Sequence, residues 1–459
     1  MTTLVAPVPP PETQKPAGRG KAGGLLQILG VAFGLAIIVG NTIGMGILRT
    51  PGDVAARLPS VPLFMAVWLI GGTYALLGAL STSELSAMHP RSGGLYPLVT
   101  RGLGKGVGFI TGWTDWLATN GSVAAVAIVL GQYAGPLVGP LEGHETLTAS
   151  GVVIFFALLQ WRGIRIGDAA QRATSLLKAL ALIALAAVAL VVGSDAAPAA
   201  AHTIVIPSGT LLAGAIVVAL QSVIYTYDGW TGPVYFGEEL VDAERAIPQS
   251  MIGGVLLVLG IYLALNVAFL AVVPIAEMAG DPFVAATAAR KMFGQNGDTT
   301  IRILMIISLI ASVNALLLMA SRVPYALSRD RLLPAKLSEV NKGGTPLPSL
   351  LLSTGVTLAL ILTNTFNSLL AMLAFCFVLN YALTFASLFT LRIREPDAPR
   401  PFRVPLYPWV PGIALVGSCA FMVGALISDR RNTLWALGLV AISIPLYLVI
   451  RRMIPDTAE

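Results

Sequence analysis

Charged residues are scarce in this chain of 459 residues: lysine, arginine, aspartate and glutamate together make up 11%. Soluble domains carry about 25% of these residues, so the composition excludes an ordinary soluble protein. Hydrophobic residues make up 56%, and the mean hydropathy is +0.80. Long apolar runs separated by short polar loops are typical of a helical bundle that crosses a membrane several times.

Cysteine and histidine are also rare. Cys376 and Cys419 both fall in apolar segments, so we expect no disulfide and interpret them as packing residues. His89, His144 and His202 lie in loops far apart, which offers neither a metal site nor a nucleophile–base pair. A membrane-embedded enzyme is therefore disfavoured, and we expect no metal and no cofactor. The basic residues are scattered, which argues against a nucleic-acid partner.

About twelve segments are long and apolar enough to cross a hydrocarbon core of roughly 30 Å. The approximate bounds of these segments are 25–48, 61–88, 107–134, 147–161, 173–192, 211–236, 251–273, 301–325, 350–363, 369–391, 410–427 and 433–450. We expect a ten-helix transport core in residues 25–392, followed in residues 393–459 by helices 11 and 12 and the C-terminus.

Both ends of the chain are expected to face the cytoplasm. Residues 1–24 are rich in proline, glycine and alanine, which predicts a disordered cytoplasmic tail and not a signal peptide. With this tail inside, about 21 of the 29 lysine and arginine residues fall on the inner side and about 7 on the outer side. The positive-inside rule predicts such a bias, and it indicates a multi-pass protein of the cell membrane.

Two of the apolar segments contain runs that a membrane helix should avoid. The first extends from Gly40 to Gly46 (GNTIGMG), and the second extends from Tyr227 to Pro233 (YDGWTGP). Glycine costs a helix about 1 kcal/mol and proline about 3 kcal/mol relative to alanine. Freed backbone groups in hydrocarbon are costly unless something binds them. Corresponding breaks in helices 1 and 6 suggest two inverted repeats of five helices and a substrate site near the membrane midplane.

The chemistry of these breaks suits a zwitterion. A half-helix that begins near Gly46 presents free N–H groups to a carboxylate, and the half-helix that ends near Asn41 presents carbonyl groups to an ammonium group. Carbonyl groups near Tyr225 and Asp228 would add acceptors. An ammonium group and a carboxylate held a few ångströms apart describe an α-amino acid. The alternative is that the glycines only permit close helix packing.

Two charged residues inside these spans have more than one interpretation. Lys178 could be a fixed cation beside the break in helix 1, or a lysine that snorkels to the interface. Asp228 could select a cationic side chain, accept a proton for coupling, or cap the second half of helix 6. The rings of Tyr225 and Trp230 flank the second break, and either could close over a substrate as a gate.

Several short motifs occur in a defined order between about residues 30 and 411. They are GNTIGMGI at 40–47, EL at 84–85 followed by PRSGG at 90–94, YDGW at 227–230 with EE at 238–239, SRVPY at 321–325 and RPFRVP at 400–405. Together they resemble the amino acid–polyamine–organocation superfamily, and within it the L-type amino acid transporters and their bacterial relatives. The resemblance implies a LeuT-type fold and Na⁺-independent amino acid transport, often by exchange.

The resemblance also implies roles for individual residues. The backbone amides of residues 43–46 would bind the substrate carboxylate, and the carbonyl groups of Thr42, Tyr225 and Asp228 would hold its amino group. Tyr225 would form an aromatic lid, and Lys178 would take the place of a sodium ion. Met45 stands where relatives often have serine. The full substrate-binding set is Asn41, Thr42, Ile43, Gly44, Met45, Gly46, Tyr225, Asp228 and Gly229.

The sequence therefore predicts an amino acid exchanger or permease that works by alternating access. The second candidate is a proton-coupled carrier of cationic amino acids or polyamines. A pure channel is disfavoured by the two discontinuous helices. We expect no obligate partner subunit, because the outer loop between helices 3 and 4 lacks the cysteine that links animal members to theirs.

Overall fold

The computed structural model describes residues 24–44, 46–193, 208–281, 283–363, 366–428 and 430–453. Across these residues the regular structure is helical, and strand-like pairing is limited to two isolated bridges, Leu29 with Leu240 and Ser92 with Phe236. The predicted all-α class is confirmed. The predicted tail lies outside the described residues except for Gly24, and Met45 also lies outside them.

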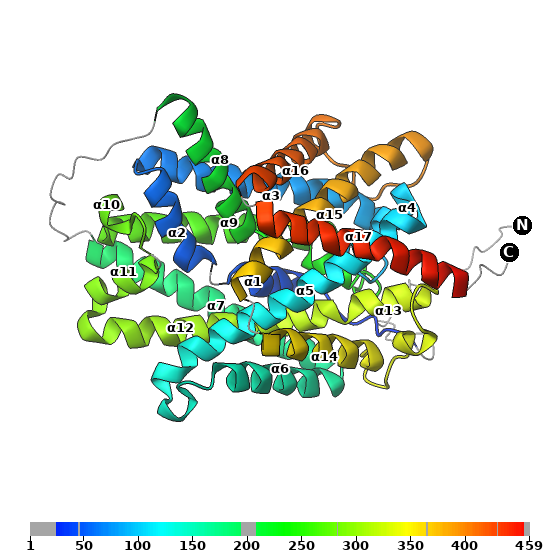
Figure 1. Ribbon diagram of the computed structural model, residues 1–459, viewed down its shortest axis with the longest axis horizontal. Helices are drawn as coiled ribbons and strands as arrows, with labels where there is room; N and C mark the ends of the chain where they lie inside the picture. The colour runs from blue at the N-terminus through cyan, green and yellow to red at the C-terminus, as the bar shows by residue number, and fades with distance from the viewer. Residues whose placement is uncertain are drawn as a thin grey trace, which may run out of the picture.

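Most helices run roughly along the long axis of the molecule (Figure 1). The α-helices are α1 Val31–Thr42, α2 Gly46–Arg57, α3 Val61–Met88, α4 Tyr96–Leu103, α5 Lys105–Ala134, α6 Glu145–Trp161, α7 Ile164–Gly193, α8 Gly209–Thr226, α9 Ala243–Val272, α10 Ile275–Met278, α11 Val284–Phe293, α12 Gly297–Ala320, α13 Arg322–Arg329, α14 Leu347–Thr363, α15 Phe366–Arg394, α16 Trp409–Ser428 and α17 Arg430–Met453. The 3₁₀-helices are η1 Gly135–Leu137, η2 Gly139–Leu141, η3 Gly232–Tyr235, η4 Gly294–Asn296 and η5 Ala335–Ser338.

Nine of the described helices are long and apolar enough to cross a membrane. The pair α1 and α2, bent by 47° at the first break, would make a tenth span. Two further apolar helices, Glu145–Trp161 and Leu347–Leu362, are shorter. These segments correspond to the twelve predicted ones, but a 17-residue helix is only about 25 Å long. The count of twelve crossings and the inverted repeat therefore stay predictions.

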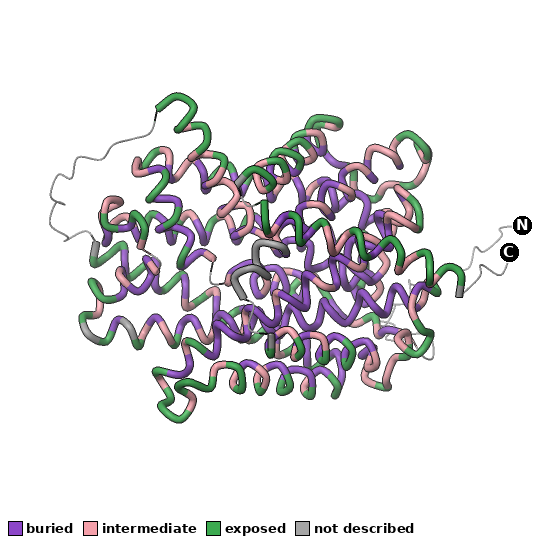
Figure 2. The backbone as a smooth tube through the Cα atoms, in the orientation of Figure 1, coloured by how far each residue is buried: buried purple, intermediate pink, exposed green. Residues whose placement is uncertain are grey.

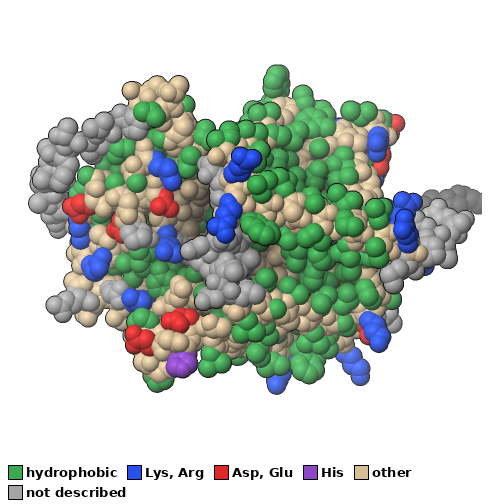
Figure 3. Space-filling model, in the orientation of Figure 1, with side chains coloured by type: hydrophobic (Ala, Val, Ile, Leu, Met, Phe, Trp, Pro, Cys, Tyr) green, Lys and Arg blue, Asp and Glu red, His purple; other side chains and the backbone are tan. Residues whose placement is uncertain are grey.

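The buried residues gather in the middle of the bundle, where α1, α3, α5, α9 and α12 pack against one another or against a shared neighbour (Figure 2). The outer helices α6, α16 and α17 are largely exposed in the same view. Hydrophobic side chains cover much of the right half of the face in Figure 3, while most charged side chains lie towards its two ends. This distribution suits a membrane protein, because the surrounding lipid is itself apolar.

The molecule has two distinct ends along its long axis. The α13 end, at the right in Figure 1, carries α4, α13 and the last turns of α17, and the α11 end, at the left, carries α10 and α11. The half-helix α2 extends from the first break towards the α11 end, where Gly52 packs against Asp281. The half-helix α1 lies on the other side of the break.

The first helix begins six residues later than predicted, at Val31 instead of residue 25. The preceding residues are extended and pair with the segment that follows α8. The N–H groups of Ile28 and Leu29 donate to the Glu239 carbonyl (3.0 and 2.9 Å), and the Val241 N–H donates to the Leu29 carbonyl (2.8 Å). These apolar residues satisfy their backbone by pairing with a distant segment, which hydropathy alone does not reveal.

The second broken segment is helical over only part of its predicted length. Helix α8 ends at Thr226, and no α-helix follows among the described residues until α9 begins at Ala243. Turns and the four-residue helix η3 fill the interval. The predicted second half of helix 6 is therefore wrong as a continuous α-helix, because Gly229 adopts φ +117° and Gly232-Pro233 favours a turn.

Candidate functional site

The first break separates α1 from α2 and leaves backbone groups at both helix ends. The Ile43 N–H already donates to the Val39 carbonyl (3.2 Å), and the Gly44 N–H donates to the Thr42 carbonyl (2.9 Å). Both amides therefore already have acceptors in this conformation, and their predicted binding of a carboxylate stays a prediction. The free donors of a helix are those of its first turn, so the first turn of α2, from Gly46 onward, is the place where an anion would bind.

The second break lies against the first. Gly229 has φ +117°, a region that glycine enters without strain, and a Cβ atom there would lie 2.7 Å from the Thr42 Oγ1. The Asn41 side chain donates to the Gly229 carbonyl at 3.4 Å. A Cβ atom on Gly46 would lie 2.9 Å from the Thr226 Cγ2. Both glycines are thus required for the close approach of the two broken segments.

Tyr262 of α9 joins the ends of the two half-helices. Its hydroxyl lies 2.8 Å from the Thr42 carbonyl and 3.0 Å from the Thr226 carbonyl, and it donates to either one. The hydroxyls of Thr50 and Thr226 are 2.9 Å apart and add a second connection. The Thr42 carbonyl, which was predicted to hold a substrate amino group, therefore already has a protein donor within reach.

A cavity of about 330 Å³ opens between the two breaks and the side chains of α5, α12 and α15. Arg49 and Asp53 of α2 also line it, so the cavity extends towards the α11 end. Ile43 does not line the cavity. The predicted substrate-binding residues that do line it are Asn41, Thr42, Gly44, Gly46, Tyr225, Asp228 and Gly229.

Lys178 of α7 is 1% exposed and does not snorkel to an interface. Its ammonium group donates to the carbonyl groups of Gly40 (2.9 Å) and Ile43 at the end of α1. Its third donor contacts the Ser312 hydroxyl at 3.0 Å. Ser312 and Ser308 donate to the same two carbonyl groups at 2.7 and 3.1 Å. A positive charge therefore sits at the negative end of the α1 dipole, behind the first break.

Asp228 lines the cavity and is half-buried. Its Oδ1 accepts a hydrogen bond from the Tyr381 hydroxyl of α15. The capping interpretation fails, because the nearest following helix is η3, whose N-cap is Thr231. Asp228 is thus a carboxyl group held at the wall of the cavity by two neutral donors, the Tyr381 hydroxyl and the Gly229 N–H.

The two rings predicted as gates lie in different places. Tyr225 is half-buried and lines the cavity. Trp230 is 2% exposed and is not among the cavity-lining residues. Its ring packs on Tyr381 at a centroid distance of 4.7 Å and lies against Gly78 of α3. In this conformation Trp230 supports the wall behind Asp228, and of these two rings only that of Tyr225 faces the cavity.

A family model described as amino acid permease matches residues 25–449. The chain belongs to the amino acid permease family. The expected membership of the amino acid–polyamine–organocation superfamily is thereby confirmed. The family comprises membrane transporters and not enzymes.

Individual relatives of this permease match it over most of its length. It is similar to the serine/threonine exchanger SteT of Bacillus subtilis (strain 168), with 27% identity over 435 residues that cover 94% of this chain and 98% of the relative. It is similar to the large neutral amino acids transporter small subunit 2 of Homo sapiens, at 29% identity with 94% and 82% coverage. It is also similar to the b(0,+)-type amino acid transporter 1 of Mus musculus, at 26% identity with 89% and 84% coverage.

The α13 end of the permease is closed by one buried and one partly exposed ion pair. Glu239, in the segment that pairs with Leu29, forms a bidentate pair with Arg322 of α13 at 2.9 and 3.0 Å, and both side chains are fully buried. Glu238 pairs with Arg329 of the same helix. Since removing one partner of a buried pair is strongly destabilising, the Glu239–Arg322 pair holds the segment after α8 firmly against α13.

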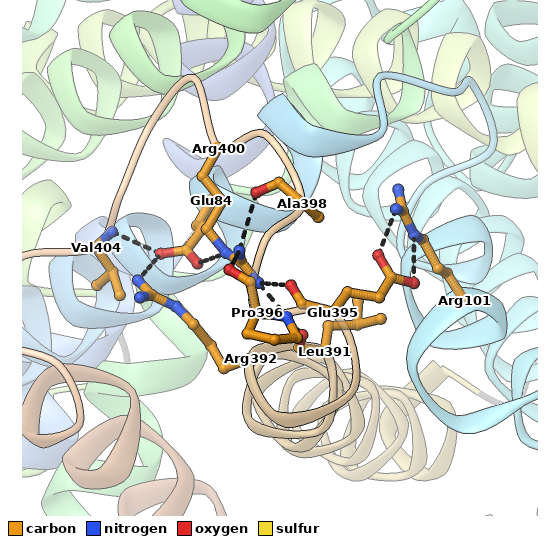
Figure 4. A network of polar contacts seen from close by, with 9 residues as sticks. All are labelled: Glu84, Arg101, Leu391, Arg392, Glu395, Pro396, Ala398, Arg400 and Val404. Atoms are coloured by element: carbon orange, nitrogen blue, oxygen red, sulfur yellow. Dashed lines mark hydrogen bonds and ion pairs between the residues drawn. The ribbon is translucent and has the colours of Figure 1, made fainter.

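A second network anchors the chain after α15 (Figure 4). The buried carboxylate of Glu84, on α3, accepts bonds from Arg392 (2.6 Å), Arg400 (3.0 Å) and the Val404 N–H (2.7 Å). The Arg400 guanidinium also donates to four carbonyl groups at the end of α15, and Arg101 pairs with Glu395 nearby. The network fastens the connection between α15 and α16 to the end of α3.

Two functional candidates in the permease were missed from sequence. Tyr262 lies in an apolar helix where a single hydroxyl gave no distinctive signal. Asp115 of α5 is 1% exposed and accepts the Tyr235 hydroxyl at 2.7 and 2.8 Å. A lone carboxyl group inside the predicted span 107–134 was a usable signal, because an ionisable residue within the membrane is by default a functional hypothesis.

Proposed function

We propose that this permease is a Na⁺-independent amino acid transporter that works by alternating access and by exchange. The observation that carries the proposal is the meeting of both backbone breaks at one cavity. The first turn of α2 offers N–H donors for a carboxylate, and the broken end of α8 offers carbonyl groups for an ammonium group. Few small molecules other than α-amino acids carry these two groups at so short a spacing.

The cavity also suits a small substrate. Ligand pockets usually measure roughly 300–1000 Å³, and this cavity of about 330 Å³ is at the lower end. The named relatives include a serine/threonine exchanger and a transporter of large neutral amino acids. We therefore propose neutral amino acids as the principal substrate class, with the carboxyl group of Asp228 tuning the preference between neutral and cationic side chains.

Lys178 supports independence from sodium. Its ammonium group occupies the position where a cation would neutralise the carbonyl groups at the end of α1. A monovalent metal ion there would meet a positive charge in a buried site, which is strongly unfavourable. The fixed charge of Lys178 therefore stabilises the end of α1 as a bound sodium ion would, but it does not couple transport to a sodium gradient.

The transport cycle would alternate between the two ends of the molecule. In this conformation the cavity extends towards the α11 end, while the Leu29–Leu240 pairing and the Glu239–Arg322 pair close the α13 end. The last turns of α17 lie at the α13 end (Figure 1), so a cytoplasmic C-terminus places that closed end inside the cell and the open α11 end outside. This is an outward-facing arrangement. Rocking of α1, α2, α3, α8 and α9 would break the closing contacts and release the substrate inward.

The alternative is a proton-coupled carrier of cationic amino acids or polyamines, which is favoured by the carboxyl group of Asp228 at the cavity wall. A polyamine lacks the carboxylate that the first turn of α2 would bind, so the zwitterion site argues against it. We also propose that the permease works in the cell membrane without an obligate partner subunit.

Uptake by purified protein in liposomes tests the proposal. A panel of radiolabelled neutral and cationic amino acids and putrescine would be offered to vesicles with and without internal amino acid, in sodium or choline buffer. We expect uptake of neutral amino acids that is stimulated by internal substrate and unchanged in choline. Transport of putrescine alone, or a strict requirement for sodium, would contradict the proposal.

A further inference from the structure

A carboxyl group lies deep in the bundle outside the proposed amino acid site. Asp115 is the tenth residue after Lys105, the first residue of α5, so it lies about 15 Å along that helix. It is 1% exposed. A charge at such a depth is strongly disfavoured unless a partner compensates it.

No compensating charge accompanies Asp115 among the described residues. Its two oxygen atoms share the hydroxyl of Tyr235, which follows α8. The other titratable groups that face it are Asp228, before η3, and Tyr381 and Cys376 of α15, which are all neutral or acidic. Among the described residues of the other helices that pack against α5, no charged group interacts with the Asp115 carboxyl group. The nearby arginines of α13 are engaged by Glu238 and Glu239.

The surroundings of Asp115 connect the cavity with the α13 end. Its partner Tyr235 lines the cavity. The turn at Gly93 and Gly94 adjoins both residues: a Cβ atom on Gly94 would lie 2.6 Å from the Tyr235 ring and 2.8 Å from the Asp115 Oδ2, and the Gly93 N–H donates to the Tyr235 carbonyl at 3.3 Å. Gly94 belongs to the turn before α4, at the α13 end. Asp115 is therefore hydrogen-bonded to a residue that lines the cavity, and its carboxyl group directly adjoins the turn before α4.

We propose that Asp115 is a proton-binding site that couples proton movement to amino acid transport. In the outward-facing state a proton from the cavity passes by way of the Tyr235 hydroxyl to the Asp115 carboxylate, which becomes a neutral carboxyl group. When the α13 end opens, water reaches the turn at Gly94, and the carboxyl group releases the same proton there. One proton enters and one leaves in each cycle, and no other bond is made or broken. This inference rests on the proposed function.

Histidine is poorly placed to replace Asp115 in this role. His89 lies at the end of α3, outside the membrane-spanning segments. Burial, assisted by the positive charges of Arg91, Arg101 and Arg329, lowers the pKa of His89 to about 4. His89 is therefore neutral throughout the physiological range and does not carry a proton in the cycle.

Substitution of Asp115 by asparagine tests the proposal, because it keeps the shape of the side chain and removes the ionisable group. Liposomes would contain wild-type protein, Asp115→Asn or the control Asp168→Asn, which removes a carboxylate paired with Arg172 outside the cavity. Two activities would be measured: exchange of labelled for internal alanine without a pH gradient, and accumulation of alanine in empty vesicles with acid outside. With one proton per amino acid, a gradient of one pH unit supports at most about tenfold accumulation.

We expect the wild type and Asp168→Asn to accumulate alanine and to acidify the vesicle interior, as reported by a trapped pH-sensitive dye. Asp115→Asn should lose both signals and retain exchange. The proposal is overturned if wild-type transport moves no protons, if Asp115→Asn still accumulates alanine, or if a folded Asp115→Asn loses exchange as well. Exchange by a wild type that moves no protons would leave the proposed function standing, whereas no transport of any amino acid would overturn that function too. If Asp115→Asn does not fold, Tyr235→Phe should shift the pH dependence of accumulation, and an unchanged pH profile would refute the proposal.

Discussion

Replacing Lys178 by alanine removes the positive charge that holds the broken end of α1. The ammonium group donates to the carbonyl groups of Gly40 and Ile43. Hydrogen bonds from a charged donor contribute about 1.5–3 kcal/mol each, so the two bonds together stabilise this geometry by about 3–6 kcal/mol. Ser312 and Ser308 still donate to the same carbonyl groups, which favours the lower end of that range.

A loss of about 3 kcal/mol lowers the population of the binding-competent break by roughly a hundredfold. We therefore expect Lys178→Ala to reduce the initial rate of amino acid uptake in liposomes by about two orders of magnitude, with normal insertion and elution on size exclusion. Lys291→Ala is a matched control, because this lysine pairs with Glu277 in a half-exposed ion pair at the α11 end. Exposed pairs contribute about 0–1 kcal/mol, so the control should transport normally.

Two results would refute the reasoning about Lys178. Uptake by Lys178→Ala at the wild-type rate would show that the charge is dispensable. An equal loss in Lys291→Ala would show that the assay responds to lysine removal in general. Binding of labelled substrate to detergent-solubilised protein separates the two stages: we expect Lys178→Ala to lose binding, because the defect lies in the site itself and not in the opening of the α13 end.

Four further predictions concern the cavity. Asp228→Asn should lower uptake of lysine and arginine more than uptake of alanine and leucine in a competition assay, and an equal loss for all four would reject charge selection. Gly229→Ala should abolish uptake, because φ +117° and a contact of 2.7 Å exclude a Cβ atom, whereas Gly260→Ala, with open space around it, should transport normally. Tyr262→Phe removes a hydrogen bond of about 1 kcal/mol, so we expect initial uptake to fall about fivefold, and an unchanged rate would argue that the hydroxyl is idle. Replacing sodium by choline should leave the uptake rate unchanged, and a strict sodium requirement would remove the argument from Lys178.

The local features of the site were predictable from the sequence. Gly40–Gly46 and Tyr227–Pro233 stand out because glycine and proline are penalised in helices and cluster there with polar residues inside apolar segments. Isolated prolines such as Pro248 and Pro445 lie inside continuous helices, so the clustering and not a single residue marks a break. Lys178 and Asp228 stand out because ionisable residues are rare in apolar segments. The same logic marks Asp115, a carboxyl group within the apolar segment 107–134.

The partners of these residues were decided by the tertiary structure. Tyr262 and Thr42 are separated by 220 positions, and neither local sequence predicts the hydrogen bond between them. Residues 25–30 are not helical, because Ile28 and Leu29 pair their backbone with the distant segment 239–241. Hydropathy alone predicted a helix there. The places of Tyr225 at the cavity and Trp230 behind it depend on how α3 and α15 pack. Clusters of glycine and proline favour a helix break through the intrinsic preferences of neighbouring residues, whereas the partner of each freed donor and acceptor depends on which distant helix lies beside it.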